Sequence, residues 1–181
     1  PPAFINAPGD LTIPCSEATS YNPLTLSYTN GGIDACLITG TVTPTLQGNP
    51  PNICGSNSTY TWTFTDQCNN TINHNQVVTV TPIAPPVFQN PPTNITVNCD
   101  QVPTGPADLS YANGDAGSCS LSGSVPGSVS GTSNACGGNI QYTWNFTDQC
   151  NNTIQHIQTI TVNPAALPVF VNPPANITVS C

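Results

Sequence analysis

The sequence predicts an all-β protein built as two tandem antiparallel β-sandwiches, and three observations lead to this prediction. The chain of 181 residues nearly repeats itself every 82 to 84 residues, cysteines included. Aromatic and polar residues alternate along its best-repeated segment, as they do in a half-buried strand. Proline, glycine and asparagine interrupt every gap between such segments, and no stretch has helical periodicity. About seven short strands per repeat are typical of a sandwich of the immunoglobulin type.

Two blocks carry the repetition. The segment 60–72 returns as 142–154 with one substitution, and a shorter block occurs three times, ending at Cys15, Cys99 and Cys181. Self-similarity at a fixed period indicates an array of structural modules rather than one domain. Because the chain opens inside a repeat, we expect it to be a segment of a longer protein. The expected domains are a repeat in 1–84, a second repeat in 85–166 and the first strand of a third in 167–181.

The aromatic strand of each repeat is expected to lie in the core. Tyrosine, tryptophan and phenylalanine alternate there with threonine or asparagine, which places all three rings on one face. An exposed tryptophan could stack on a sugar, but flanking rings on the same face favour a core position. The expected core residues are Tyr60, Trp62, Phe64, Tyr142, Trp144 and Phe146.

A β-hairpin follows from the next residues. The turn Asp-Gln-Cys-Asn-Asn separates the aromatic strand from a second alternating strand that closes each repeat. Asp66 and Asp148 stand at the mouth of this turn, so we expect them to accept bonds from nearby backbone N–H groups. Other strands of the second repeat are expected at 94–99, 107–112, 119–125 and 127–132, with equivalents in the first.

The joints between repeats are rich in proline. Residues 81–86 and 163–168 each follow the last strand of a repeat and lead into the next. Proline fixes φ and favours an extended conformation in the residue before it, so such joints are semi-rigid spacers. We therefore expect the sandwiches to be arranged as a rod.

Cysteine usage predicts disulfides formed in an oxidising compartment. Each repeat carries four cysteines at recurring spacings, and Cys181 is the ninth, expected to pair beyond this segment. A zinc site needs closer spacing than any found here. Four cysteines allow three connectivities. We rank first the one that joins cysteines expected at the same pole of a sandwich: Cys15–Cys54, Cys36–Cys68, Cys99–Cys136 and Cys119–Cys150.

Other candidate sites are weak. His74 and His156 recur on the apolar face of the last strand, where a backbone-bonded histidine is more common than a metal ligand or general base. Calcium is an alternative for the acidic residues, but eight acids spread over two repeats make a poor site, so no cofactor or metal is expected. No motif of nucleophilic, acid–base or phosphate chemistry occurs, and we expect no enzyme activity.

Charge excludes several classes of partner. The chain has no Lys or Arg and a net charge of −8, so it has no cation to contact nucleic acid phosphates or anionic lipid. No apolar run approaches the length of a membrane span, and direct membrane insertion is not expected.

The two blocks together resemble a known repeat class. The run Asn-Ile-Thr-Val-(Asn/Ser)-Cys, the aromatic strand with its Asp-Gln-Cys-Asn-Asn turn, and a strand closing in Thr-Val-(Thr/Asn)-Pro are similar to HYR-like repeats of Bacteroidota surface proteins. This resemblance covers the whole chain. It implies immunoglobulin-like modules without catalytic residues, in giant adhesins exported by the type IX system.

The resemblance also implies a place and partners. It implies an extracellular filament attached to the outer membrane that supports cell adhesion and gliding motility. The implied partners are neighbouring repeats, the gliding and secretion machinery, and a substratum or surface polysaccharide gripped by the whole filament. The alternative is that each repeat binds a glycan or a protein through its polar loops. A third reading is an accessory region of a secreted polysaccharide-degrading enzyme.

Overall fold

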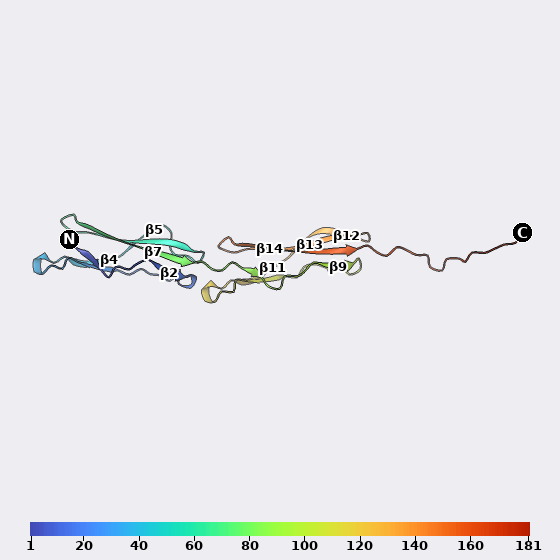
Figure 1. Cartoon of the computed structure of the whole chain (residues 1–181), viewed down its shortest axis with the longest axis horizontal. Coiled ribbons are helices and arrows are strands. Elements are labelled where there is room, and N and C mark those ends of the chain that lie inside the picture. The colour runs from blue at the N-terminus through green and yellow to red at the C-terminus, as the bar shows by residue number, and fades with distance from the viewer. The chain divides into compact units, whose positions relative to one another are not determined.

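A computed structural model describes all residues, 1–181, and its ordered elements are strands and three short 3-10 helices (Figure 1). Each repeat supplies seven strands, as the sequence predicts. The first repeat holds β1 (Ala3–Ile5), β2 (Leu11–Pro14), β3 (Leu26–Thr29), β4 (Thr39–Val42), β5 (Thr45–Gln47), β6 (Ser56–Thr65) and β7 (Thr71–Thr81). The second holds β8 (Val87–Phe88), β9 (Ile95–Asn98), β10 (Leu109–Ala112), β11 (Ser122–Val125), β12 (Ser128–Asn134), β13 (Gly137–Thr147) and β14 (Thr153–Asn163). The 3-10 helices are η1 (Cys15–Glu17), η2 (Asp34–Cys36) and η3 (Gly117–Cys119).

Two sheets form in each repeat with the same topology. The first repeat has a three-stranded sheet of order β1-β3-β4 and a four-stranded sheet of order β2-β7-β6-β5. The second repeats this arrangement with β8-β10-β11 and β9-β14-β13-β12. The long hairpin strands β6 and β7 pair antiparallel, while β2 runs parallel to β7 and β9 parallel to β14. These are tandem immunoglobulin-like β-sandwiches, which confirms the predicted fold class.

The core of the first repeat lies between its two sheets. Alternation along β6 and β7 turns one set of side chains inward, where apolar burial stabilises the sandwich. The buried cluster consists of Ile13, Ala18, Leu26, Tyr60, Trp62, Val78 and Val80. The second repeat buries the equivalent set, including Leu109, Ile140, Tyr142, Trp144, Ile160 and Val162.

The compact units of the chain differ from its repeats. One unit consists of Pro1–Gln89, Ser110–Gly123 and Thr147–Ile154, and the other of Asn90–Leu109, Ser124–Phe146 and Gln155–Cys181. The first unit therefore takes in one end of the second repeat. The domain boundaries at residues 84 and 166 stay a prediction.

Residues 164–181 form no strand, and every one of them is exposed. This segment includes the predicted first strand of a third repeat. In the two complete repeats that strand is held by parallel pairing with the last strand of its own repeat, β7 or β14.

Candidate functional site

The most distinctive site is a pair of disulfides that join the first repeat to the second. Cys15 bonds to Cys119 and Cys54 bonds to Cys150, with Cα atoms 5.9 and 5.1 Å apart. All four cysteines belong to the first compact unit. The predicted bonds Cys15–Cys54 and Cys119–Cys150 are therefore wrong. Both structural bonds cross from one repeat to the next.

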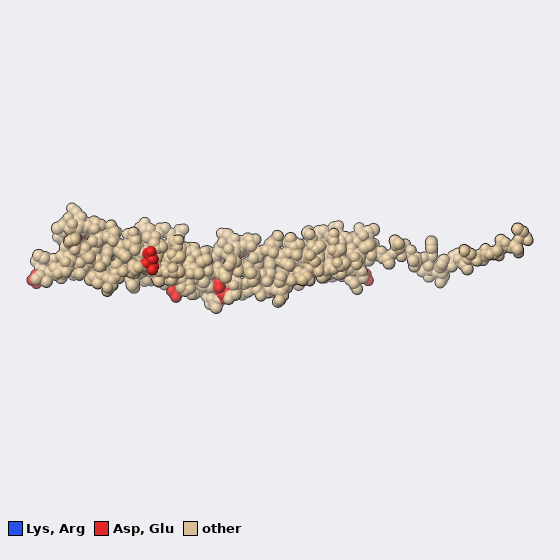
Figure 2. Space-filling view, in the orientation of Figure 1, with Lys and Arg blue, Asp and Glu red and all other residues tan.

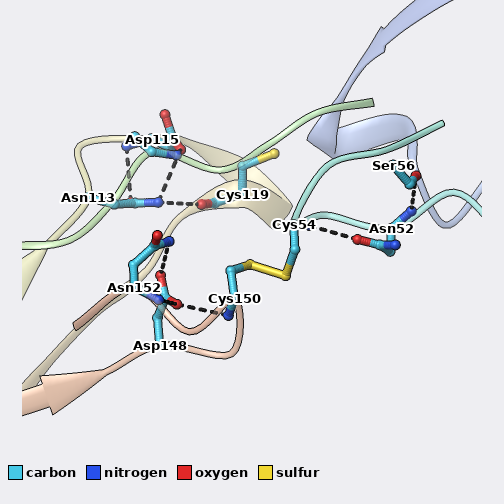
Figure 3. Close-up of a disulfide and its surroundings, with 10 residues drawn as sticks. Asn52, Cys54, Ser56, Asn113, Asp115, Cys119, Asp148, Cys150 and Asn152 are labelled. Carbon is cyan, nitrogen blue, oxygen red and sulfur yellow. Dashed lines mark hydrogen bonds between the residues drawn. A yellow bond between two sulfur atoms is a disulfide. The ribbon is translucent and has the colours of Figure 1, made fainter. Parts of the chain in front are cut away.

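Cys15 and Cys54 lie at the end of the first repeat where β7 terminates. Cys15 directly follows β2, whose last residue pairs with the last residue of β7. Cys54 sits in a turn before β6, and its N–H donates to the Asn52 side chain at 3.0 Å (Figure 3). The N–H of Ile83, just beyond β7, donates to the Ile53 carbonyl at 2.9 Å and ties this turn to the same end.

Cys119 and Cys150 lie in two loops of the second repeat. Cys119 ends η3 and is 6% exposed, and its carbonyl accepts a bond from the Asn113 amide at 2.8 Å (Figure 3). Cys150 lies in the hairpin turn between β13 and β14, where its N–H donates to Asp148 at 2.8 Å. Each cysteine of this pair is thus held in place by a local asparagine or aspartate.

The joint between the repeats explains why the bonds cross. Residues 81–86 were expected to be a spacer, yet Ile83 is 3% exposed and Pro86 is fully buried. The N–H of Ala84 donates to the Asp115 carboxylate at 2.8 Å, and the N–H of Gln89 to the Ser110 carbonyl. A joint packed in this way brings the second repeat's loops to the end of the first. The sequence-based ranking assigned a common pole to each pair but treated every repeat as a closed set of four.

Five cysteines are free: Cys36, Cys68, Cys99, Cys136 and Cys181. The predicted bonds Cys36–Cys68 and Cys99–Cys136 are therefore absent from the structure. Apart from Cys99, which is half-buried, all of these thiols are exposed.

The Asp-Gln-Cys-Asn-Asn turn is a hydrogen-bonded unit in both copies. One Asp66 oxygen accepts bonds from the N–H groups of Cys68 and Asn70 at 2.8 and 2.9 Å, and the other accepts from the Asn70 amide at 2.9 Å. Asn69 has φ 61°, a left-handed conformation that asparagine tolerates. The aspartates therefore serve the turn, in the role expected from the sequence.

These bonds change the acidity of both aspartates. The Asn70 amide, followed by the N–H groups of Asn70 and Cys68, holds the pKa of Asp66 below its usual 3.8. Burial acts to raise the pKa of Asp148, but the bonds from Asn152 and Cys150 outweigh it and the pKa is lowered. Both carboxylates are thus committed to neighbouring donors.

The tryptophans occupy the core. Trp62 is fully buried and its indole N–H donates to the Leu24 carbonyl at 2.9 Å, while Trp144 is 2% exposed and donates to Ala107 at 2.9 Å. Tyr60 and Tyr142 are buried as well, at 6% and 4% exposure. The remaining predicted core residues, Phe64 and Phe146, are half-buried. Neither tryptophan offers an exposed ring face on which a sugar could stack.

The histidines pack beside these tryptophans. Ring centroids of His74 and Trp62 are 5.7 Å apart, as are those of His156 and Trp144. Nε2 of His74 bonds to the Pro8 carbonyl at 2.7 Å, and Nε2 of His156 to the Pro92 carbonyl at 2.8 Å. Because a carbonyl only accepts, Nε2 is the donor in each bond. It anchors the loop that precedes β2 in the first repeat and β9 in the second. Both histidines therefore bond to the backbone, as expected from the sequence.

Acidic residues are scattered. Figure 2 shows them as separate spots on the visible face, with no Lys or Arg anywhere in the chain. No three His, Cys, Asp or Glu side chains lie close enough together to hold a metal ion. The expectation that neither repeat holds a cofactor or metal stays a prediction.

The side-chain bonds of two asparagines were not predicted from the sequence. Asn113 accepts from the N–H of Leu121 at 2.9 Å and donates to the Cys119 carbonyl, and Asn30 makes the matching bonds around Cys36. The recurring Asn-Gly pair at these positions was the available signal. Asp115 was not detectable in this way, because the first repeat has Gly32 there.

No helix in the structure combines the length and apolar character needed to cross a membrane. In a comparison with curated proteins, none matches the chain. A family model described as "HYR-like domain with 4 cysteines" matches residues 5–80 and 87–162. Domains of this family are generally extracellular modules of structural or adhesive type and are not catalytic. Two matches covering most of the sequence place the chain in a family, and it belongs to the HYR-like domains with four cysteines, as two tandem copies.

Proposed function

We propose that this chain is a structural repeat segment of a long adhesin filament on the cell surface, supporting attachment and gliding motility. The family and the disulfides support an extracellular or surface location. The resemblance to type IX-secreted adhesins of Bacteroidota, and to the gliding adhesin SprB in particular, supports the finer assignment. In this proposal the joints bear load, the repeats set distance, and adhesion arises from the whole filament.

The observation that carries the proposal is the covalent joint between repeats. Two disulfides, Cys15–Cys119 and Cys54–Cys150, span it at separate points. A filament that is dragged across a surface carries tension along its backbone. At such a joint the bonds transmit the tension from repeat to repeat, and the sandwich of the first repeat is bypassed.

The bypass has a measurable length. With both bonds closed, the shortest covalent path from Pro1 to Cys181 runs through the Cys15–Cys119 bond. That path spans roughly 260 Å when fully extended, compared with roughly 610 Å for the reduced chain. The pairing within repeats considered from sequence would give roughly 350 Å.

Single-molecule stretching of the chain between its ends tests the mechanical role. In oxidising buffer we expect the chain to stretch to a full length of roughly 260 Å without breaking. After reduction we expect a full length of roughly 610 Å. A chain that extends fully without reductant would contradict the load-bearing joint. The control is the Cys54→Ser/Cys150→Ser variant, which keeps the shortest path and should extend like the wild type.

The adhesin assignment needs a cellular test. In cells that produce the protein, in-frame deletion of both repeats should leave surface export intact and reduce attachment and gliding. Unchanged attachment and gliding would contradict the proposal. A glycan array probed with the two-repeat chain separates the alternative, because saturable binding to one glycan would favour a binding module. A pocket of about 340 Å³ beside Trp144 and Gln158 is where such a ligand would be sought.

A further inference from the structure

The free cysteines of the first repeat occupy the positions that are bonded in the second. Cys36 ends η2 as Cys119 ends η3. The Asn30 amide donates to the Cys36 carbonyl at 2.8 Å, the same bond that Asn113 makes to Cys119. Each repeat therefore presents its own copy of this cysteine loop.

Cys68, the second free cysteine of the first repeat, matches Cys150 of the second repeat in the same way. The N–H of Cys68 donates to Asp66 at 2.8 Å, as that of Cys150 donates to Asp148. Cys36 and Cys68 line one open pocket of about 520 Å³, whose wall includes the stacked rings of Tyr28 and Phe64, 3.8 Å apart. We call this surface the receiving end. In the second repeat the equivalent Cys119 is 6% exposed, whereas Cys36 is exposed.

The opposite half of the joint is also present in free form. Cys99 follows β9 as Cys15 follows β2. The N–H of Cys136 donates to Asn134 at 2.8 Å, as that of Cys54 donates to Asn52 at 3.0 Å.

The same backbone bond closes both turns. The N–H of Ala165 donates to the Ala135 carbonyl at 2.8 Å, and the bond from Ile83 to Ile53 is its counterpart. We call the Cys99 and Cys136 surface the donating end. It has the local hydrogen bonds of the half-joint that is already bonded in this chain.

From these matched halves we propose that a second copy of this chain docks its donating end on the receiving end of the first. Two disulfides would then form. Cys99 of the second copy would bond to Cys36 of the first, and Cys136 of the second copy would bond to Cys68 of the first. This pairing copies the register of the bonds Cys15–Cys119 and Cys54–Cys150. The contact is heterologous, so each added copy presents a new free end and growth is open.

Each bond forms by oxidation of two thiols. The thiolate of Cys36 attacks oxidised glutathione, which gives a mixed disulfide and releases one glutathione. The thiolate of Cys99 then attacks the mixed disulfide and releases the second. Two protein thiols thus lose two protons and two electrons, and one oxidised glutathione becomes two reduced molecules.

The two joints differ in their non-covalent contacts. Asp115 holds the N–H of Ala84 in the internal joint, but Gly32 stands at the equivalent position of the receiving end. With a net charge of −8 and no cation, two copies also repel each other at low salt. Assembly between copies therefore needs physiological salt and a concentration of about 1 mM, the effective concentration that a short tether supplies.

The test uses two complementary variants of the 181-residue chain, both with Cys181→Ser. One carries Cys36→Ser/Cys68→Ser and keeps only the donating end. The other carries Cys99→Ser/Cys136→Ser and keeps only the receiving end. Each is incubated alone and in a mixture in a glutathione redox buffer at 0.15 M salt and about 1 mM protein, then resolved on a non-reducing gel.

We expect monomers from each variant alone and a dimer only in the mixture, with a ladder from the parent that has just Cys181→Ser. Peptic mapping at low pH should show Cys36 joined to Cys99 and Cys68 to Cys136, beside the intact internal bonds. Pepsin is needed because the chain has no Lys or Arg for trypsin. Monomers in the mixture, a Cys36–Cys68 bond in the parent, or dimers from one variant alone would each overturn the proposal. The adhesin function would survive that result, since the joint within one chain does not require assembly between copies.

Discussion

Removal of one inter-repeat bond should destabilise the chain by an amount that its loop length sets. We consider the variant Cys15→Ser/Cys119→Ser, in which Cys54–Cys150 stays closed. With that bond in place, Cys15–Cys119 closes a loop of about 70 residues in the unfolded chain. The chain-entropy relation then gives about 4.4 kcal/mol lost from the free energy of unfolding of both repeats. Cys36→Ser removes an exposed free thiol and should change it by less than about 0.5 kcal/mol.

The assay is guanidinium denaturation followed by tryptophan fluorescence, since Trp62 and Trp144 report on one repeat each. Free thiols are alkylated first, so that disulfides cannot exchange during unfolding. Thiol counting in denaturant checks the connectivity independently. The double variant should expose no thiol that the wild type lacks, because both partners of one bond have been removed. If Cys15 and Cys119 were bonded to other cysteines, two additional thiols would appear and the reasoning would be refuted.

Three further perturbations test the hairpin turn, the core and the close pairing of β12 with β13 at Gly131. Because folding lowers the pKa of Asp66, its contribution to the free energy of unfolding is present above pH 3.8 and is lost as pH falls through the folded pKa. Asp66→Asn should therefore flatten the fall in stability with decreasing pH, measured by denaturation at a series of pH values. Trp62→Phe leaves the Leu24 carbonyl without its donor and should cost about 1–3 kcal/mol in chemical denaturation. Gly131→Ala forces a side chain at φ +81° against the Asn139 carbonyl and should lower the melting temperature, whereas Gly9→Ala, with open space around it, should not.

The long strands could be predicted from the sequence because their signal is local. The alternation along residues 60–65 and 142–147 is a period of two that needs no knowledge of the rest of the chain. The strands expected at 94–99 and 127–132 appear as β9 and β12, shifted by a residue or two at their ends. The short edge strands β1 and β8 were missed, since two or three residues carry no period.

The hairpin turn was readable for the same reason. Asp66 accepts bonds from the backbone N–H groups two and four residues further along the chain, so both partners lie within the same short segment. The histidine bonds to Pro8 and Pro92 were only half readable. A backbone acceptor was expected, but these acceptors lie more than sixty residues away in the chain.

The sequence by itself determined the repeat, the fold class, the core aromatic residues and the oxidised character of the chain. The repeat rests on the self-similarity of the sequence, and the other properties rest on composition or on a period of two, so none of them needs the tertiary structure. Only the tertiary structure decided which cysteines bond. A disulfide joins two segments of the chain that lie close together in space. These segments come together because the joint from Ile83 to Pro86 is buried and because the N–H of Ala84 donates to Asp115. The four bonded cysteines therefore join one repeat to the next, and no bond staples a single sandwich.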